Sequence, residues 1–317
     1  MKTKIVYTVV SGKGDIYLPQ AMVAAYSARK YNPNAEIILV VDTDTSLVID
    51  QDLPGIKKYL NDVIVVDVPE GMSKMHKSRY LKTTLRNVVK GDFLYIDTDT
   101  VVTADLSAID DCKADVACAL DRHALVHEHT LANGIAKDIK PFGLTLNDLK
   151  DRYFNAGVTF VKDTEKANNL FNKWYECWEK YRHSTRGIDQ PPMALANKEC
   201  GYVIEELDGK WNCQLSDDFI NYLADAKILH YFASNGKSPY RLFNDSVFKE
   251  VMENGDVPEW LKKVLDHPKS FFTPKHLLVY GDDVRFCRTY LHVMFVYHKR
   301  VFGIFERLAK LMATRHF

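Results

Sequence analysis

Features that mark several protein classes are missing from this sequence. No apolar run approaches the roughly 20 residues that a membrane-spanning helix needs, and the apolar stretch at residues 5–10 is too short for a signal peptide. The 42 Lys and Arg residues are balanced by 42 Asp and Glu residues, so no net positive field attracts nucleic acid. These absences predict a cytoplasmic protein that does not bind nucleic acid.

Cysteine pairing is also missing. The six cysteines, at positions 112, 118, 177, 200, 213 and 287, form no C-x-x-C pair and no zinc-binding spacing, so we expect them to be reduced and mostly buried. The composition is that of an ordinary folded protein, with 46% hydrophobic and 26% charged residues. A chain of 317 residues is long enough for one large α/β domain with an appendage.

The first hundred residues alternate between β-like and helix-like segments. This alternation with short links predicts a mainly parallel, doubly wound α/β sheet. The expected strands cover residues 5–10, 36–41, 63–68, 92–96, 116–120 and 157–161, and the expected helices cover residues 19–30, 78–89 and 165–181.

The last third of the chain has a different character. Residues 284–317 contain seven Lys and Arg residues and a single acid, Glu306. Six apolar residues recur at helical spacing, which predicts a basic amphipathic helix. This helix either packs on the domain with its charged face in water or docks on an anionic membrane surface, which would make the protein peripheral on the inner face of the membrane. We therefore expect a main domain at residues 1–245 and a helical region at 246–317. The six apolar residues are Val301, Ile304, Phe305, Leu308, Leu311 and Met312.

Two Asp-Thr-Asp triplets each follow a β-like run. One contains Asp97 and Asp99, and the other contains Asp42 and Asp44. On an extended backbone this spacing directs both carboxylates to one side, where they repel each other unless a positive group lies between them. A divalent cation bound to a phosphorylated substrate is the usual partner of such a pair, and a solvated turn is the plain alternative.

Topology favours Asp97 and Asp99. In a doubly wound sheet of order 3-2-1-4, ligands bind between strands one and four, and these residues end the fourth strand. His230 ends the apolar run at residues 226–229 and precedes a loop with Lys237. An imidazole there can complete a metal site while Lys237 meets a diphosphate, although a lone histidine at a strand end is more often a core residue.

Taken together, these motifs resemble glycosyltransferase family 8, whose members are retaining, metal-dependent transferases of the GT-A fold that use nucleotide-activated sugars. The resemblance spans about residues 3–240, with the motifs in the family's order. The motifs are Asp97-Thr98-Asp99, Tyr153-Phe154-Asn155-Ala156-Gly157-Val158, Asp189-Gln190, and His230-Tyr231 with Lys237.

The resemblance implies a role for each matching residue. Asp97, Asp99 and His230 would bind Mn²⁺ or Mg²⁺, and oxygen ligands with one imidazole suit Mn²⁺. Arg79 and Lys237 would contact the diphosphate or sugar of a UDP-sugar donor. The residues near the nucleotide would be Thr8, Val9 and Thr98, and those on the sugar and acceptor side would be Asp121, Asn155, Asp189 and Gln190. Asp189, Gln190 and Arg79 would lie nearest the reacting centre.

The implied function is transfer of a hexose to a glycan or lipid-linked acceptor, as in lipopolysaccharide or capsule synthesis. The sequence departs from the family pattern at residues 9–15 after the first strand, at Pro191 after Asp189-Gln190, and in the loop before Lys237. Two other functions remain open at this point. One is a nucleotidyltransferase, slightly supported by Gly12-Lys13-Gly14, and the other is a catalytically silent relative that binds glycan or nucleotide.

Overall fold

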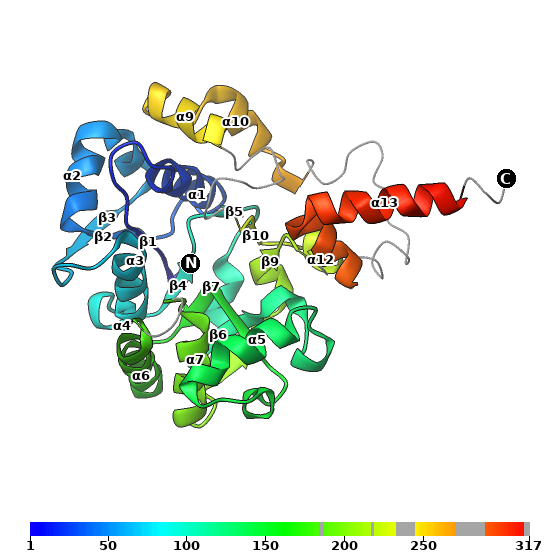
Figure 1. Cartoon of the computed structure of the whole chain (residues 1–317). Coiled ribbons are helices and arrows are strands. Elements are labelled where there is room, and N and C mark those ends of the chain that lie inside the picture. The colour runs from blue at the N-terminus through cyan, green and yellow to red at the C-terminus, as the bar shows by residue number, and fades with distance from the viewer. Residues whose placement is uncertain (184–186, 217–218, 233–244, 270–288, 314–317) are drawn as a thin grey trace.

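The centre of the protein is a seven-stranded sheet with the order β3-β2-β1-β4-β7-β6-β8 (Figure 1). The computed structural model describes residues 1–183, 187–216, 219–232, 245–269 and 289–313. The strands of this sheet are β1 (Lys4–Val9), β2 (Ile37–Asp42), β3 (Asp62–Val66), β4 (Phe93–Ile96), β6 (Val116–Leu120), β7 (Phe154–Val161) and β8 (Ile204–Glu206).

The strand directions confirm the α/β class and the mainly parallel sheet. β1 pairs in parallel with β2 and β4, β2 pairs in parallel with β3, and β6 pairs in parallel with β8. β7 runs antiparallel to both of its neighbours, β4 and β6. The expected strand order 3-2-1-4 is therefore present, and the end of β4 lies where the winding of the sheet reverses.

A second, three-stranded sheet has the order β5-β10-β9. Its strands are β5 (Thr100–Val102), β9 (Cys213–Gln214) and β10 (Ile228–His230). β10 pairs antiparallel with β5 and parallel with β9. This small sheet joins the segment that directly follows β4 to a segment more than a hundred residues later.

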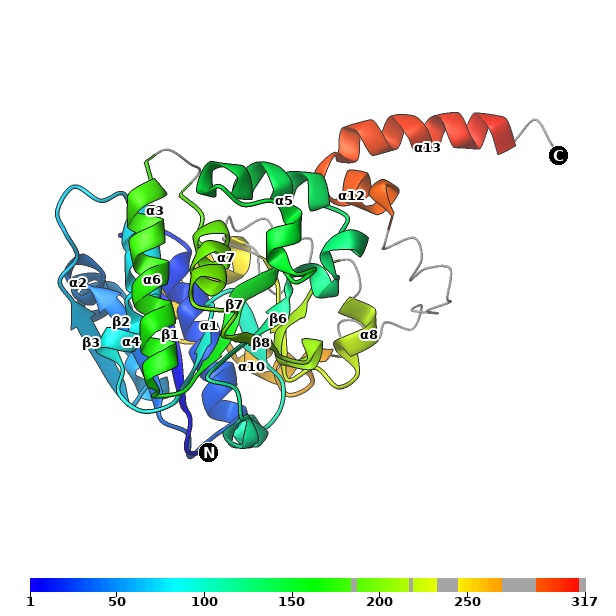
Figure 2. The same cartoon turned by 90° about the horizontal axis from the view of Figure 1, so that it is seen from below.

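Helices cover both faces of the large sheet because its strands are apolar on both sides. Ile5 and Tyr7 of β1 belong to a core cluster with α1, whereas Val6 belongs to a cluster with α3 and α6, as the alternation of a strand requires (Figures 1 and 2). The helices of this part of the chain are α1 (Tyr17–Tyr31), α2 (Thr43–Asp52), α3 (Lys74–Thr83), α4 (Leu85–Val88), α5 (Ala132–Ile139), α6 (Glu165–Tyr181), α7 (Gln190–Glu199) and α8 (Ile220–Leu223).

Two predicted segments differ from the structure. The helix expected at residues 78–89 begins four residues earlier, because the hydroxyl of Ser73 accepts a hydrogen bond from the His76 amide and caps the helix. It also breaks at Thr84, whose backbone leaves the helical region. The strand expected to begin at 157 begins at Phe154, which pairs with Leu120 across an irregularity in the register.

Two helices beyond residue 244 pack on the main core. α9 (Asp245–Asn254) and α10 (Glu259–Val264) lie over α1, and the buried side chains Val247, Phe248 and Leu261 belong to the same core cluster as α1 and β1 (Figure 1). Tyr59 and Asp256 are hydrogen-bonded across this contact. The segment at residues 245–264 therefore shares its core with the sheet.

The last two helices make much less contact with the rest of the protein. α12 (Tyr290–Tyr297) lies beside the body, and α13 (Lys299–Ala313) projects away from it (Figures 1 and 2). The basic amphipathic helix expected from the sequence is thus present. Among the described residues, none forms a helix with the length and apolarity needed to cross a membrane.

We predict that the α9–α10 segment is required for the stability of the whole fold. Phe248 is 1% exposed, so Phe248→Ala should lower the free energy of unfolding by about 3–5 kcal/mol through lost burial and a residual cavity. Leu47→Ala, at a site that is 54% exposed, is the control and should change it by less than about 0.5 kcal/mol. Urea unfolding of both variants measures this difference, and equal stability of the two would contradict the shared core.

Candidate active site

Two strand ends bring Asp97, Asp99 and His230 together. Asp97 follows β4, and its backbone amide donates to the carbonyl of Gly157 on β7 at 2.7 Å. Asp99 immediately precedes β5, and His230 ends β10, where it pairs with Thr100. The amide of Tyr231 donates to the Asp99 carbonyl at 2.9 Å, which holds the two chain segments side by side.

These three side chains form a compact donor set. Each offers a ligand atom, and the three atoms lie within 4.8 Å of one another. Asp99 and His230 are buried, and His230 Nε2 lies 3.2 Å from Asp99 Oδ1. Burial alone would lower the pKa of His230, but the charge and hydrogen bond of Asp99 outweigh it and raise this pKa.

Two side chains outside the Asp-Thr-Asp triplet, Lys82 and Tyr95, hold one carboxylate oxygen of Asp97. Lys82 Nζ lies 3.2 Å from Asp97 Oδ1, and the Tyr95 hydroxyl donates to the same oxygen. The other carboxylate oxygen, Oδ2, lies beside Gly157 and His230. Asp97 therefore has one oxygen fixed within the protein and one directed toward the histidine.

A buried ion-pair network adjoins this donor set. Asp189 Oδ1 lies 3.2 Å from Arg79 Nε, and Asp189 Oδ2 lies 3.0 Å from Lys82 Nζ. Burial would raise the pKa of Asp189, but the two cations lower it well below its usual range. Burial would likewise lower the pKa of Lys82, and the carboxylates of Asp189 and Asp97 raise it instead. Both charges therefore persist at neutral pH.

The position of Asp189 depends on α6. The indole of Trp174 donates to the Asp189 carbonyl at 2.8 Å, and the indole of Trp178 donates to the Gly187 carbonyl at 3.4 Å. Both tryptophans are almost fully buried. They lie one helical turn apart, so a single helix face supports the whole segment that leads into α7.

Asp121 lies behind two residues that face the site. Its Oδ1 accepts hydrogen bonds from Asn155 Nδ2 at 2.9 Å and from Gln190 Nε2 at 3.1 Å. Its Oδ2 lies 3.1 Å from His129 Nε2. Although burial acts to raise the pKa of Asp121, these bonds and the nearby charges lower it. Asp121 thus orients Asn155 and Gln190 as a carboxylate anion.

An open cleft of about 320 Å³ contains these groups. A second hollow of about 160 Å³ adjoins it, and Thr8, Tyr17, Arg79 and Thr98 line both. Val9 lines the second hollow, whereas Asp121 is in neither lining. Lys237 lies outside the described residues. The remaining predicted site residues that line the cleft are Asp97, Asp99, Asn155, Asp189, Gln190 and His230.

The second carboxylate pair has a different partner. Lys77 Nζ lies 2.8 Å from Asp42 Oδ2 and 2.6 Å from Asp44 Oδ2. The Asp42 side chain also caps α2 by accepting from the Thr45 amide at 3.1 Å. In this pair a lysine and a helix terminus neutralise the charge, so its function is local and structural.

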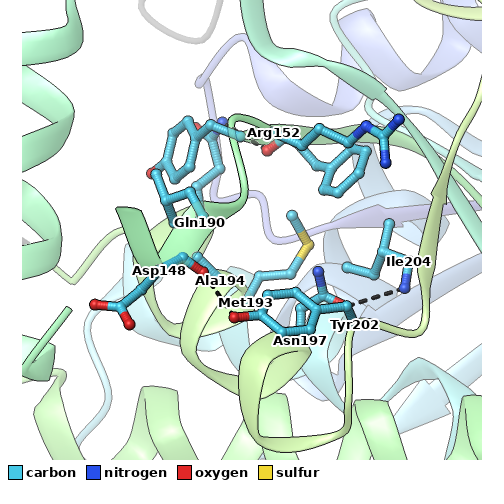
Figure 3. A pocket seen from close by; sticks show the side chains of 11 residues that line it. Asp148, Arg152, Gln190, Met193, Ala194, Asn197, Tyr202 and Ile204 are labelled. Carbon is cyan, nitrogen blue, oxygen red and sulfur yellow. Dashed lines mark hydrogen bonds between the residues drawn. The ribbon is translucent and has the colours of Figure 1, made fainter. Parts of the chain in front are cut away.

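A smaller pocket lies behind Gln190 (Figure 3). Gln190 lines both this pocket and the cleft. The pocket holds about 10 Å³, which is room for about one water molecule. Figure 3 shows that Tyr202 donates its hydroxyl to the Asp148 carbonyl and that the Ile204 amide donates to Asn197, so polar groups in this pocket already have partners.

Sequence reasoning missed four residues of the site. Lys82 and Tyr95 hold Asp97, Asn212 accepts a hydrogen bond from His230, and Phe232 stacks on the His230 ring at 4.4 Å between centroids. Only Lys82 had a usable signal, because it lies three residues after Arg79 on one helix face. Tyr95 and Phe232 lie two residues from Asp97 and His230, but neither belongs to a motif, and Asn212 reaches His230 only through the pairing of β9 with β10.

The donor chemistry fits a divalent cation of the Mn²⁺ or Mg²⁺ type. Two carboxylates and one imidazole form a mixed oxygen and nitrogen set, which suits Mn²⁺. Asp99 is buried and Asp97 is half-buried, so these adjacent acids also need positive charge beyond what Lys82 supplies to Asp97. The site can therefore bind a cation that in turn holds a phosphate, beside a guanidinium from Arg79.

Comparison with known proteins supports a sugar-transfer site. The family model described as Glycosyl transferase family 8 matches residues 8–238. No curated protein matches the sequence.

Several solved structures are similar in fold. The galactosyltransferase LgtC in complex with donor and acceptor sugar analogs has 17% identity and a TM-score of 0.51, over 82% of this chain and 99% of that one. An active-site mutant of LgtC has the same identity and coverage and a TM-score of 0.52. The glycosyltransferase GlyE of Streptococcus pneumoniae TIGR4, also 17% identical, covers 85% of this chain and 65% of its own, with a TM-score of 0.49. The two LgtC structures confirm the expected GT-A fold.

We predict that Gly157 is essential to the donor set because the set leaves no room for a side chain. A Cβ at this position would lie 2.3 Å from His230 Cε1 and 2.9 Å from Asp97 Oδ2, so Gly157→Ala must displace the histidine. Calorimetric titration should show Mn²⁺ binding weakened at least about tenfold.

Gly134→Ala is the control for this prediction. Its Cβ would meet nothing closer than 3.9 Å within α5, and alanine is favoured in helices. Mn²⁺ affinity should be unchanged in this variant. Unaltered affinity in Gly157→Ala, with the fold intact by circular dichroism, would contradict the close packing of the donor set.

Proposed function

Because the chain belongs to glycosyltransferase family 8 and is a glycosyltransferase, we propose that it is a metal-dependent, retaining enzyme that transfers a hexose. The donor is a nucleotide-sugar, with a UDP-sugar as the expected form, and the acceptor is a glycan or glycolipid of the lipopolysaccharide or capsule type. The observation that carries this proposal is the convergence of Asp97, Asp99 and His230 in the cleft.

In this proposal, Asp97, Asp99 and His230 hold Mn²⁺ or Mg²⁺. When bound, such a cation supplies electrostatic stabilisation to the diphosphate leaving group. Arg79 adds a fixed positive charge, because its guanidinium lines the cleft and is oriented by Asp189. A guanidinium binds phosphate oxygens in a bidentate manner, which suits a leaving diphosphate. Lys237 is proposed to contact the same diphosphate.

The arrangement of Asp189 supports a positioning function in the reaction. Arg79 and Lys82 hold its two oxygens, so a nucleophilic attack by this carboxylate would first have to break two buried ion pairs. A retaining reaction without a protein nucleophile avoids this cost. The acceptor hydroxyl attacks the anomeric carbon of the sugar from the face on which the diphosphate leaves. A departing phosphate oxygen takes the proton of that hydroxyl.

Gln190 is proposed to support the sugar near its reacting carbon. Its Nε2 donates to Asp121 Oδ1 and to the Phe154 carbonyl, each at 3.1 Å. Because both amide hydrogens have acceptors within the protein, Gln190 presents its Oε1 as an acceptor. A carbonyl oxygen directed at the sugar can accept a hydroxyl hydrogen bond and stabilise positive charge that develops on the ring.

The nucleotidyltransferase alternative finds no support in the first loop. A phosphate-binding glycine loop needs free backbone amides. Here the Gly12 amide donates to Asp15 Oδ2 at 2.6 Å, and Lys74 Nζ lies 3.1 Å from the same oxygen. Asp15 thus occupies the groups that would bind a triphosphate.

Asp99→Ala tests the metal-dependent reaction. Loss of this ligand should lower Mn²⁺-stimulated hydrolysis of UDP-sugars at least about 100-fold, because the leaving group loses its electrostatic stabilisation. Asp44→Ala makes the same change in the matched Asp-Thr-Asp triplet and should keep activity near that of the wild type. Full Mn²⁺-dependent activity in Asp99→Ala would disprove this assignment.

We also propose that the protein acts in the cytoplasm as a peripheral protein on an anionic membrane. The apolar residues of α13 lie on its surface, and Val301, Ile304, Phe305 and Leu308 are each 45% exposed or more. Lys299, Arg300 and Arg307 lie on the same helix, with Glu306 as its one acid. An exposed apolar face flanked by positive charge complements the surface of an anionic bilayer.

The attachment of α12 to the main body supports a membrane contact near the sugar-binding side of the cleft. Tyr297 ends α12, and its hydroxyl accepts a hydrogen bond from Arg122, whose guanidinium also lies 5.4 Å from the Tyr297 ring centroid. Arg122 follows Asp121 in the chain. The helices that would meet the membrane are therefore tied to a turn beside the sugar-binding side, which suits a lipid-linked acceptor.

Acidic substitutions on α13 test the membrane proposal. Ile304→Asp combined with Leu308→Asp should abolish cosedimentation of the full chain with phosphatidylglycerol vesicles, because it removes the apolar contact and adds repulsion. Leu47→Asp on α2 is the matched control and should bind like the wild type. Unchanged vesicle binding by the double variant would contradict the proposal.

A further inference from the structure

A line of buried amides connects His230 with the sugar-binding side of the cleft. His230 Nδ1 lies 3.0 Å from Asn212 Oδ1, and Asn212 Nδ2 donates to Asn155 Oδ1 at 3.0 Å. Asn155 Oδ1 also accepts from the Gly157 backbone amide at 2.9 Å, and Asn155 Nδ2 donates to Asp121 Oδ1 at 2.9 Å. The three side chains of this amide relay, which we define as Asn155, Asn212 and His230, are buried.

Both ends of the relay fix its direction. A backbone amide can only donate, so the atom of Asn155 beside Gly157 must be its oxygen. A carboxylate can only accept, so the atom beside Asp121 must be the Asn155 nitrogen, in agreement with the first constraint. Asn212 must then direct its nitrogen to Asn155 and its oxygen to His230. An oxygen at that place requires a hydrogen on His230 Nδ1.

We propose that Asn212 is a positioning residue that holds His230 in the Nδ1-protonated form, which leaves the Nε2 lone pair directed at the metal site. This inference rests on the proposed metal-dependent function. A histidine ligand of this kind commonly donates its other ring N–H to a fixed acceptor, which sets the tautomer and the orientation of the ring.

The backbone explains why Asn212 can perform this task. Asn212 ends a 3₁₀ turn (Gly209–Asn212) and directly precedes β9, whose residues Cys213 and Gln214 pair in register with Leu229 and His230 of β10. The Leu215 amide also donates to the His230 carbonyl at 2.9 Å. Asn212 is therefore carried on the strand that flanks His230 and does not depend on a loop for its position.

The relay also joins two parts of the proposed site. Asp121 orients Asn155 at one end of the relay and Gln190 beside it, so the same carboxylate sets the direction of the amides that face the sugar and, through Asn212, the tautomer of the metal-binding histidine. A change in Asn212 should therefore affect metal binding before it affects the fold of the cleft.

Nuclear magnetic resonance of the full wild-type chain tests the tautomer directly. Long-range ¹H–¹⁵N correlations of histidine-labelled protein at alkaline pH, where the ring is neutral, distinguish a protonated ring nitrogen from a bare one. His230→Gln identifies the signals among the 11 histidines. We expect Nδ1 to be protonated, although Asp99 Oδ1 lies 3.2 Å from Nε2 and competes for the ring proton in the metal-free protein. A neutral His230 with its proton on Nε2 would overturn the proposal.

Two variants of Asn212 test its effect on the metal. Asn212→Leu keeps a similar volume but removes the acceptor, and Mn²⁺ affinity measured by calorimetry should fall about 10–100-fold. Asn212→Asp retains an acceptor for Nδ1–H and should bind Mn²⁺ at least about tenfold more tightly than Asn212→Leu does. Equal Mn²⁺ affinity of the wild type and Asn212→Leu would overturn the positioning function.

The two measurements separate this inference from the proposed function. If the wild type binds no Mn²⁺, the metal-dependent function fails, whereas the tautomer in the spectrum still decides whether Asn212 fixes the ring. If the wild type binds Mn²⁺ and the spectrum shows Nε2 protonated in the metal-free neutral form, the function stands and the inference fails. Circular dichroism of each variant confirms that affinity is compared between folded proteins.

Discussion

The antiparallel pairing of β5 with β10 is the contact on which the site depends. It places His230 opposite Thr100, one residue after Asp99, and thereby brings an imidazole to two carboxylates that the chain would otherwise present alone. The carboxylates lie in the link between β4 of the large sheet and β5 of the small sheet, whereas the histidine ends β10 of the small sheet. The junction of the two sheets therefore creates the donor set, and Gly157 leaves the space in which the set fits.

Charge balance explains why the surrounding residues are those observed. The half-buried carboxylate of Asp97 and the buried carboxylate of Asp189 share Lys82, and Asp189 also has Arg79. A buried charge without a partner costs several kcal/mol, so these ions support one another. Arg79 completes this balance and still lines the cleft. The same arrangement that satisfies the buried acids thus directs positive charge toward a bound phosphate.

Some of this arrangement was predictable from local pattern. The apolar runs and turns predicted a doubly wound sheet, whose common strand order 3-2-1-4 is present. Helix α6 lies at the expected residues, because strand and helix periodicity depend on neighbours in the chain. The choice between the two Asp-Thr-Asp triplets also followed from topology. The structure shows the physical difference between them, since Lys77 and the start of α2 already neutralise Asp42.

The sequence by itself determined the α/β class, the carboxylate pair at the switch point, the histidine and the basic amphipathic helix α13. Each of these follows from the spacing of residues that lie close together in the chain. Only the tertiary structure decided that Lys82 holds Asp97, that Asn212 faces His230, and that the apolar face of α13 stays exposed. These contacts depend on which strands become neighbours and on the direction of single hydrogen bonds, and short-range periodicity carries no information about either.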